Sequence, residues 1–144
     1  MAKTTNDTKT ERPSNETLGI IDPHDVFGEV ERLAQTYGAT TDHLLFAMQR
    51  LTQCKAHLEA VEASLDLSTR KSAEITGEKI TERKVKSAIE ATDQWRTART
   101  LYDQAELAVE QSKYALKTLD KKDRMIELLA RVQIRELGVN SRTQ

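Results

Sequence analysis

The sequence predicts an all-α protein, with a short N-terminal helix followed by a long antiparallel helical hairpin. Between Thr81 and Leu137 the chain contains no glycine or proline, and apolar residues recur every three or four positions, which is the spacing of one helical face. A stretch before it carries a heptad repeat. Charged residues make up 31% of the chain and aromatic residues 4%. This composition is typical of long helices with narrow apolar seams.

The first helix is expected to begin at Asp22-Pro23 and to end at Gly38. An aspartate favours the capping position, a proline the first turn, and a glycine the residue after the last turn. The apolar face of this helix consists of Val26, Val30, Leu33 and Tyr37.

The second helix is expected to begin at Thr40 or Thr41 and to end at Gly77. Its heptad seam predicts packing against another helix. The seam consists of Leu44, Ala47, Leu51, Cys54, Leu58, Val61 and Leu65. Because Cys54 falls within the seam, we interpret it as a small buried apolar residue and not as a reactive thiol.

The third helix is expected to begin after Thr81 as its cap and to run without a break to Leu137. A short connection between two long helices predicts that they pair as an antiparallel hairpin. Asp123 stands where the apolar stripe requires a core residue. The stripe consists of Val85, Ala88, Thr92, Trp95, Ala98, Tyr102, Ala105, Val109, Ser112, Leu116, Leu119, Ile126 and Leu129.

The ends of the chain are polar. We expect residues 1–21 to form a disordered tail, residues 22–137 the helical domain, and residues 138–144 a frayed C-terminus after Gly138, because such segments bury too little apolar surface to offset their ordering entropy. The N-terminus has no apolar run of the kind found in secretory signals, and no stretch is long and apolar enough to span a membrane. A single cysteine forms no internal disulfide. We therefore expect a soluble cytoplasmic protein.

Nothing in the sequence indicates an enzyme, a cofactor site or a metal site. The five glycines form no phosphate-binding loop, and His24, His43 and His57 share no ligand spacing with one another or with Cys54. Carboxylates alternate with lysines and arginines, as on solvated helix faces.

Basic residues cluster in two places, although the formal net charge is only −1. The first cluster brackets the predicted turn between the second and third helices, where it would offer phosphate contacts. A second cluster follows the third helix. Both can equally be read as solvated helix surface, and Trp95 and Tyr102 belong to the apolar stripe and not to a base-stacking platform. The first cluster consists of Arg70, Lys71, Lys79, Arg83, Lys84 and Lys86; the second consists of Lys113, Lys117, Lys121, Lys122 and Arg124.

A two-helix hairpin with a narrow apolar seam leaves part of that seam uncovered, so self-association is expected. The residues expected to drive it lie in the C-terminal half of the third helix, helped by the first helix. They are Leu119, Ile126, Leu129 and Leu137.

Three stretches give the chain a family resemblance: STRKSAEITG (68–77), TERKVKSAIEAT (81–92) and AELAVEQSKYALKTLDKKDRMIELLA (105–130). With the order of the predicted helices, they make the chain similar to the UvsY-like recombination mediators of tailed bacteriophages, over residues 22–137. Members of that family often carry tyrosines just before the glycine, where this chain has Ser72, Ala73, Glu74 and Ile75.

The resemblance implies a ring-like homo-oligomer that binds single-stranded DNA without sequence preference. It also implies two protein partners, a RecA-type recombinase and a single-strand-binding protein. The mediator helps to load the recombinase onto DNA that the single-strand-binding protein covers. The expected location is the cytoplasm of an infected host cell. By the same resemblance, the basic pair that contacts DNA corresponds to Arg70 and Lys71. The alternative from a different class is a helical structural, assembly or chaperone-like protein that does not bind DNA.

Overall fold

The computed structural model describes residues 21–140, which form three α-helices and no strand. These are α2 (Val26–Thr76), α3 (Glu82–Glu90) and α4 (Asp93–Asn140). The all-α prediction is confirmed for this part of the chain. Residues 1–20 of the predicted tail (1–21) and residues 141–144 of the predicted frayed end (138–144) lie outside the described residues.

Helix α2 begins three residues later than predicted, because Asp25 and not Asp22 is its cap. The Gly28 backbone N–H donates to Asp25 Oδ1 at 3.0 Å, which satisfies one of the free N–H groups of the first turn. Asp22 instead accepts a hydrogen bond from the His24 backbone N–H through Oδ1, at 2.9 Å. Asp22 thus forms the turn that leads into the helix.

The predicted end of a first helix at Gly38 is wrong, since α2 continues through this residue to Thr76. Gly38 does not have the positive φ that would end a helix. A single glycine inside a helix costs about 1 kcal/mol relative to alanine, and the packing of α2 on both sides of Gly38, where Leu33 and Ala47 are buried, outweighs it. The predicted first and second helices are therefore one helix of 51 residues.

The predicted end at Gly77 is confirmed. Gly77 has a φ of +68°, and the backbone N–H groups of Gly77 and Glu78 donate to the carbonyls of Glu74 and Ala73 at 3.2 and 3.0 Å. This pair of hydrogen bonds is a Schellman motif, which uses glycine because the position is left-handed. Thr81 then caps α3 as expected, with its hydroxyl accepting from the Lys84 backbone N–H.

The predicted unbroken third helix is wrong, because the chain breaks at Ala91-Thr92 into α3 and α4. The Thr92 hydroxyl accepts a hydrogen bond from the Trp95 backbone N–H at 3.3 Å and so caps α4. Asp93 follows in the first turn, where a negative charge is favoured. At the other end, α4 continues past Gly138 to Asn140, so the predicted end at Leu137 is also wrong.

The chain divides into two compact units. The terminal unit comprises the described residues up to Tyr37 together with those from Ala115 onward; the central unit is residues 38–114. Each unit has its own apolar cluster. That of the terminal unit is Val26, Leu33, Ala115, Leu119 and Ile126, and that of the central unit is Leu58, Val61 and Ala98 with Leu65, Trp95 and Tyr102 against it.

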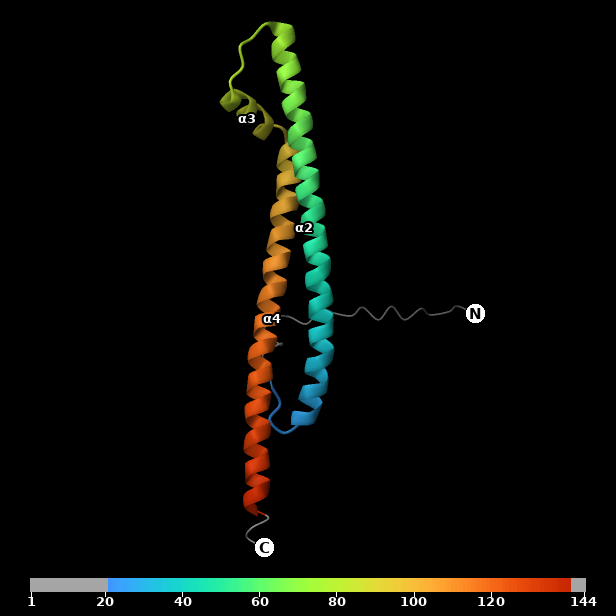
Figure 1. Ribbon diagram of the computed structural model, residues 1–144, viewed down its shortest axis with the longest axis vertical. Coiled ribbons are helices and arrows are strands. Elements are labelled where there is room, and N and C mark those ends of the chain that lie inside the picture. Colours follow the sequence, from blue (N-terminus) through green and yellow to red (C-terminus); the bar gives the residue numbers. More distant parts are fainter. Residues whose placement is uncertain (1–20, 141–144) are drawn as a thin grey trace, which may run out of the picture. The chain divides into compact units, whose positions relative to one another are not determined.

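Within the central unit, Figure 1 shows α3 beside the C-terminal part of α2, after the loop that follows Gly77. Val85 of α3 is almost completely buried, so α3 packs through one side chain on its inner face. The remaining residues of this short helix are mostly exposed. This arrangement brings charged residues from two helices and one loop close together.

Candidate nucleic-acid interface

All six basic residues of the first predicted cluster lie in the central unit, near the turn between α2 and α3. Arg70 and Lys71 belong to the last two turns of α2, Lys79 to the loop, and the other three to α3. Their side chains differ in whether they form ion pairs with neighbouring carboxylates. Three of the six are held by carboxylates of the same unit.

Arg70 is the most constrained of the six. Its Nε donates to Asp66 Oδ2 at 2.9 Å, and its Nη2 donates to both oxygens of Glu82 at 2.8 and 2.9 Å. The hydrogen bonds to Asp66 and then to Glu82 raise the pKa of Arg70 above its usual range. Arg70 therefore links α3 to α2, and a phosphate must compete with Asp66 and Glu82 for its guanidinium.

Lys84 and Lys86 take part in looser surface pairs. Lys84 Nζ lies 3.2 Å from Glu78 Oε1, and Lys86 Nζ lies 3.9 Å from Glu90 Oε1. Such exposed pairs contribute about 0–1 kcal/mol. A competing phosphate can replace them at small cost.

Lys71, Lys79 and Arg83 are exposed and form no ion pair with any residue between 21 and 140. The basic residues that remain free are thus one at the end of α2, one in the loop and one in the first turn of α3. Only Lys71 belongs to the basic pair indicated by the family resemblance.

A groove lies in the same unit, with a volume of about 420 Å³. Its apolar surface comes from Ala63, Val85, Ile89 and Trp95, and its charged surface mainly from carboxylates. Trp95 Nε1 donates to Glu62 Oε1 at 2.9 Å. This bond fixes the half-buried indole against α2, so Trp95 is part of the wall, as its place in the apolar stripe predicts.

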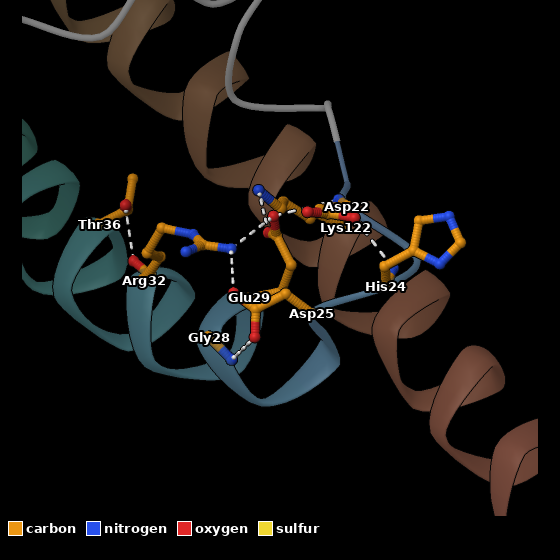
Figure 2. A network of polar contacts seen from close by, with 8 residues as sticks. All are labelled: Asp22, His24, Asp25, Gly28, Glu29, Arg32, Thr36 and Lys122. Atoms are coloured by element: carbon orange, nitrogen blue, oxygen red, sulfur yellow. Dashed lines mark hydrogen bonds and ion pairs between the residues drawn. The ribbon is translucent and has the colours of Figure 1, made fainter.

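A second polar arrangement, in the terminal unit, escaped the sequence reasoning. Figure 2 shows Glu29 of α2 between Arg32 of the same helix and Lys122 of α4. Glu29 Oε1 accepts from Arg32 Nη2 at 3.0 Å and from the Asp22 backbone N–H at 3.1 Å. Its Oε2 lies 2.8 Å from Lys122 Nζ and accepts no hydrogen bond of good geometry.

This ion pair is buried: the side chain of Glu29 is 7% exposed and that of Lys122 is 11% exposed. The adjacent Lys122 ammonium lowers the pKa of Glu29 from 4.5 to about 2, against the opposing effect of burial. Nearby, the Tyr37 hydroxyl donates to Asp120, and this bond raises the pKa of Tyr37 to about 12. The terminal unit thus pairs α2 with α4 through polar as well as apolar contacts.

The sequence does contain a signal for this ion pair. Glu29 stands three residues after Val26 and four before Leu33, and Lys122 stands three after Leu119 and four before Ile126. Both charged residues therefore occupy seam positions. Asp123, which interrupts the apolar stripe in the sequence, is exposed.

The four residues predicted to drive self-association lie in different environments. Leu119 and Ile126 are buried in the apolar cluster of the terminal unit, and Leu129 packs against it. Leu137 is 70% exposed.

In the second basic cluster, Lys122 forms the buried ion pair with Glu29, and Lys113 pairs with Glu110 at 2.8 Å.

Between residues 21 and 140 there is no group of three or more metal-ligating side chains, and no helix long and apolar enough to cross a membrane. Comparison of the chain with protein-family models, curated proteins and solved structures found no match. The resemblance to the phage recombination mediators therefore stays a prediction.

Proposed function

We propose that this protein is a non-enzymatic recombination mediator, which binds single-stranded DNA without sequence preference and helps to load a RecA-type recombinase onto DNA covered by single-strand-binding protein. The observation that carries the proposal is the group of free cations around the α2–α3 turn, Lys71, Lys79 and Arg83. Lysine and arginine side chains without a carboxylate partner bind phosphates without first breaking an intramolecular pair.

Phosphate contacts fit the kind of binding proposed. Cations that face the DNA backbone attract any sequence equally, since the phosphates carry no base information. Trp95 is fixed in the groove wall by Glu62, so stacking on this indole contributes little. Binding should therefore depend steeply on salt and hardly at all on base composition.

A mediator with three free cations per subunit binds weakly as a monomer, and repetition of the cluster in an oligomer would raise its affinity. We therefore include ring-like self-association of the predicted helical hairpin in the proposal. Leu119 and Ile126 already have partners within their own chain. Support for self-association comes instead from apolar residues left exposed in the terminal unit, such as Phe27, Leu128, Ile134 and Leu137.

The proposal is tested by titrating a labelled, sequence-neutral single-stranded oligonucleotide with the full chain at low and at moderate salt, with light scattering on the same preparation. The variant K71A/K79A/R83A should lose most of the binding while scattering and helical content stay unchanged. The matched control is K117A/K121A/R124A, which removes three exposed charges from α4 in the terminal unit. Equal losses in the two variants, or no binding by the wild type at low salt, would contradict the proposal.

The second candidate function is a structural or assembly protein that binds other helices. The exposed apolar side chains favour it, because a monomer rarely leaves so many uncovered: Phe27 is 90% exposed, and Leu45 and Phe46 on α2 are 60% and 65% exposed. An oligomer that ignores DNA at low salt would support this candidate.

A further inference from the structure

The groove of the central unit differs in charge from the turn beside it. Its carboxylates come from Glu62 and Asp66 on α2 and from Glu82 and Glu90 on α3. The only cation in the lining is Lys86, and Arg70 reaches Asp66 and Glu82 from outside it. Four carboxylates therefore face two cations, and the groove keeps an excess of two negative charges.

Two of the four carboxylates, Glu62 and Glu90, carry this excess charge. Glu62 accepts the Trp95 indole N–H and forms no ion pair with any residue between 21 and 140. Glu90 has only the loose contact with Lys86, at 3.9 Å. Asp66 and Glu82, by contrast, are both bound by Arg70. Two of the four carboxylates are thus available to a ligand.

Apolar side chains line the groove together with these carboxylates. Val85 is almost completely buried there, and Ile89 and Trp95 are half-buried. A long cationic side chain matches such a surface, because its methylene stem packs on apolar groups while its charged end reaches carboxylates. An aromatic ring adds a cation–π contact to this binding.

We propose that this groove is a docking site for an arginine or lysine side chain presented by a protein partner. The stem of the incoming residue lies along Val85, Ile89 and Trp95, and its cationic group pairs with Glu62 and Glu90. A DNA phosphate is repelled from the same surface by its net negative charge. The inference goes beyond the proposed DNA binding, because it assigns a separate ligand to a separate surface of the unit.

The test uses the intrinsic fluorescence of the full chain, because Trp95 is its one tryptophan and lines the groove. The probe is the peptide acetyl-Gly-Arg-Gly-amide. The control peptide replaces arginine by citrulline, which keeps the shape of the side chain and removes the charge. The arginine peptide should change the emission saturably, and the citrulline peptide should not. No saturable change with the arginine peptide, or an equal change with both peptides, would overturn the proposal.

A pair of variants assigns the response to the groove. E62Q/E90Q should weaken binding of the arginine peptide at least about threefold, and glutamine at position 62 still provides an oxygen for the Trp95 indole. The control E59Q/E106Q removes two exposed carboxylates of the same unit that do not line the groove. It should change the affinity by less than about twofold. Equal weakening in both variants, or displacement of the arginine peptide by oligothymidylate, would contradict the proposed site. The peptide comparison needs no variant, so it tests the proposal even if E62Q/E90Q is poorly folded.

Discussion

In the terminal unit a carboxylate and an ammonium meet in the interior, between apolar residues of α2 and α4, whereas in the central unit comparable charges stay at the surface. Glu29 and Lys122 are both nearly buried and paired at 2.8 Å. Lys71, Lys79 and Arg83 are exposed and unpaired among the described residues. A lysine thus holds two helices together inside the terminal unit, whereas these three cations of the central unit face solvent.

The two units also differ in the size of their most deeply buried apolar residues. In the terminal unit, large residues such as Leu119 and Ile126 are at most 3% exposed. In the central unit the most deeply buried residues are smaller, Ala98 at 1% and Val85 at 2% exposed, and the groove beside Trp95 is open to solvent. The comparison teaches that the two units use charge differently: the terminal unit buries an ion pair between two helices, and the central unit has the free cations and the groove.

The largest expected effect concerns the interior of the terminal unit. Leu119→Ala should lower the free energy of unfolding by about 4 kcal/mol, through lost apolar contact and the cavity left behind, because Leu119 is 1% exposed. Urea denaturation measures this. The control Leu137→Ala, at a position 70% exposed, should cost less than about 0.5 kcal/mol. Similar values for both variants would show that the interior is not packed as described.

The buried ion pair should give the next largest effect. Lys122→Met leaves Glu29 in the interior without its ammonium, and a buried charge that has lost its partner costs about 3 kcal/mol. The control Lys121→Met alters an exposed neighbour and should cost less than about 0.5 kcal/mol. If both variants unfold at the same urea concentration, the ion pair does not distinguish the two units.

Acid should weaken the terminal unit through the same carboxylate. Since folding lowers the pKa of Glu29 from 4.5 to about 2, its contribution is complete above its unfolded pKa and is lost as the pH falls toward the folded value. From about pH 6 to about pH 3 this loss amounts to about 2 kcal/mol. Glu29→Gln should remove that part of the pH dependence, which urea denaturation at several pH values measures. An identical acid dependence in wild type and variant would refute the assignment.

The smallest of these effects tests the interruption of the helix between α3 and α4. Thr92→Ala removes the cap of α4 and should cost about 1 kcal/mol, since the Trp95 N–H loses its bond to the Thr92 hydroxyl. The control Thr97→Ala alters an exposed position inside α4 and should be neutral or slightly stabilising. A Thr92→Ala variant as stable as the wild type would favour the unbroken helix that the sequence predicts.

Much of the helical pattern could be predicted from local chemistry. The apolar stripe of the third predicted helix locates buried residues from Val85 to Ile126. Gly77 and Thr81 mark the end of α2 and the start of α3, because a left-handed residue and a hydroxyl cap act through neighbouring backbone groups alone. Such signals are contained in a few consecutive residues.

The errors arise where several signals compete. Gly38 resembles a helix end, yet it lies inside α2, because glycine ends a helix only when the chain adopts the left-handed conformation there. Thr92 followed by Asp93 is a capping signal, but Thr92 also fits the three-four spacing of the apolar stripe, which predicts a continuous helix. Periodicity alone does not separate a seam residue from a cap.

The sequence predicts where the basic residues of the candidate site lie, but not which of them form ion pairs. All six basic residues lie near the α2–α3 turn, as their positions in the sequence suggest, but sequence spacing does not show that Asp66 and Glu82 hold Arg70. The ion pair between Glu29 and Lys122 joins residues more than 90 positions apart, so local spacing gives only the two seam positions. Which charges are paired depends on tertiary contacts.

The most direct test of the proposed division is the salt dependence of single-stranded DNA binding. The slope of log K against log salt should become shallower by about 2 when three contributing cations are removed in K71A/K79A/R83A. It should stay nearly unchanged in K117A/K121A/R124A, where the same charge is removed from the terminal unit. If the slope is the same in the wild type and in K71A/K79A/R83A, the free cations of the central unit do not contact DNA, and the division of roles between the two units is wrong.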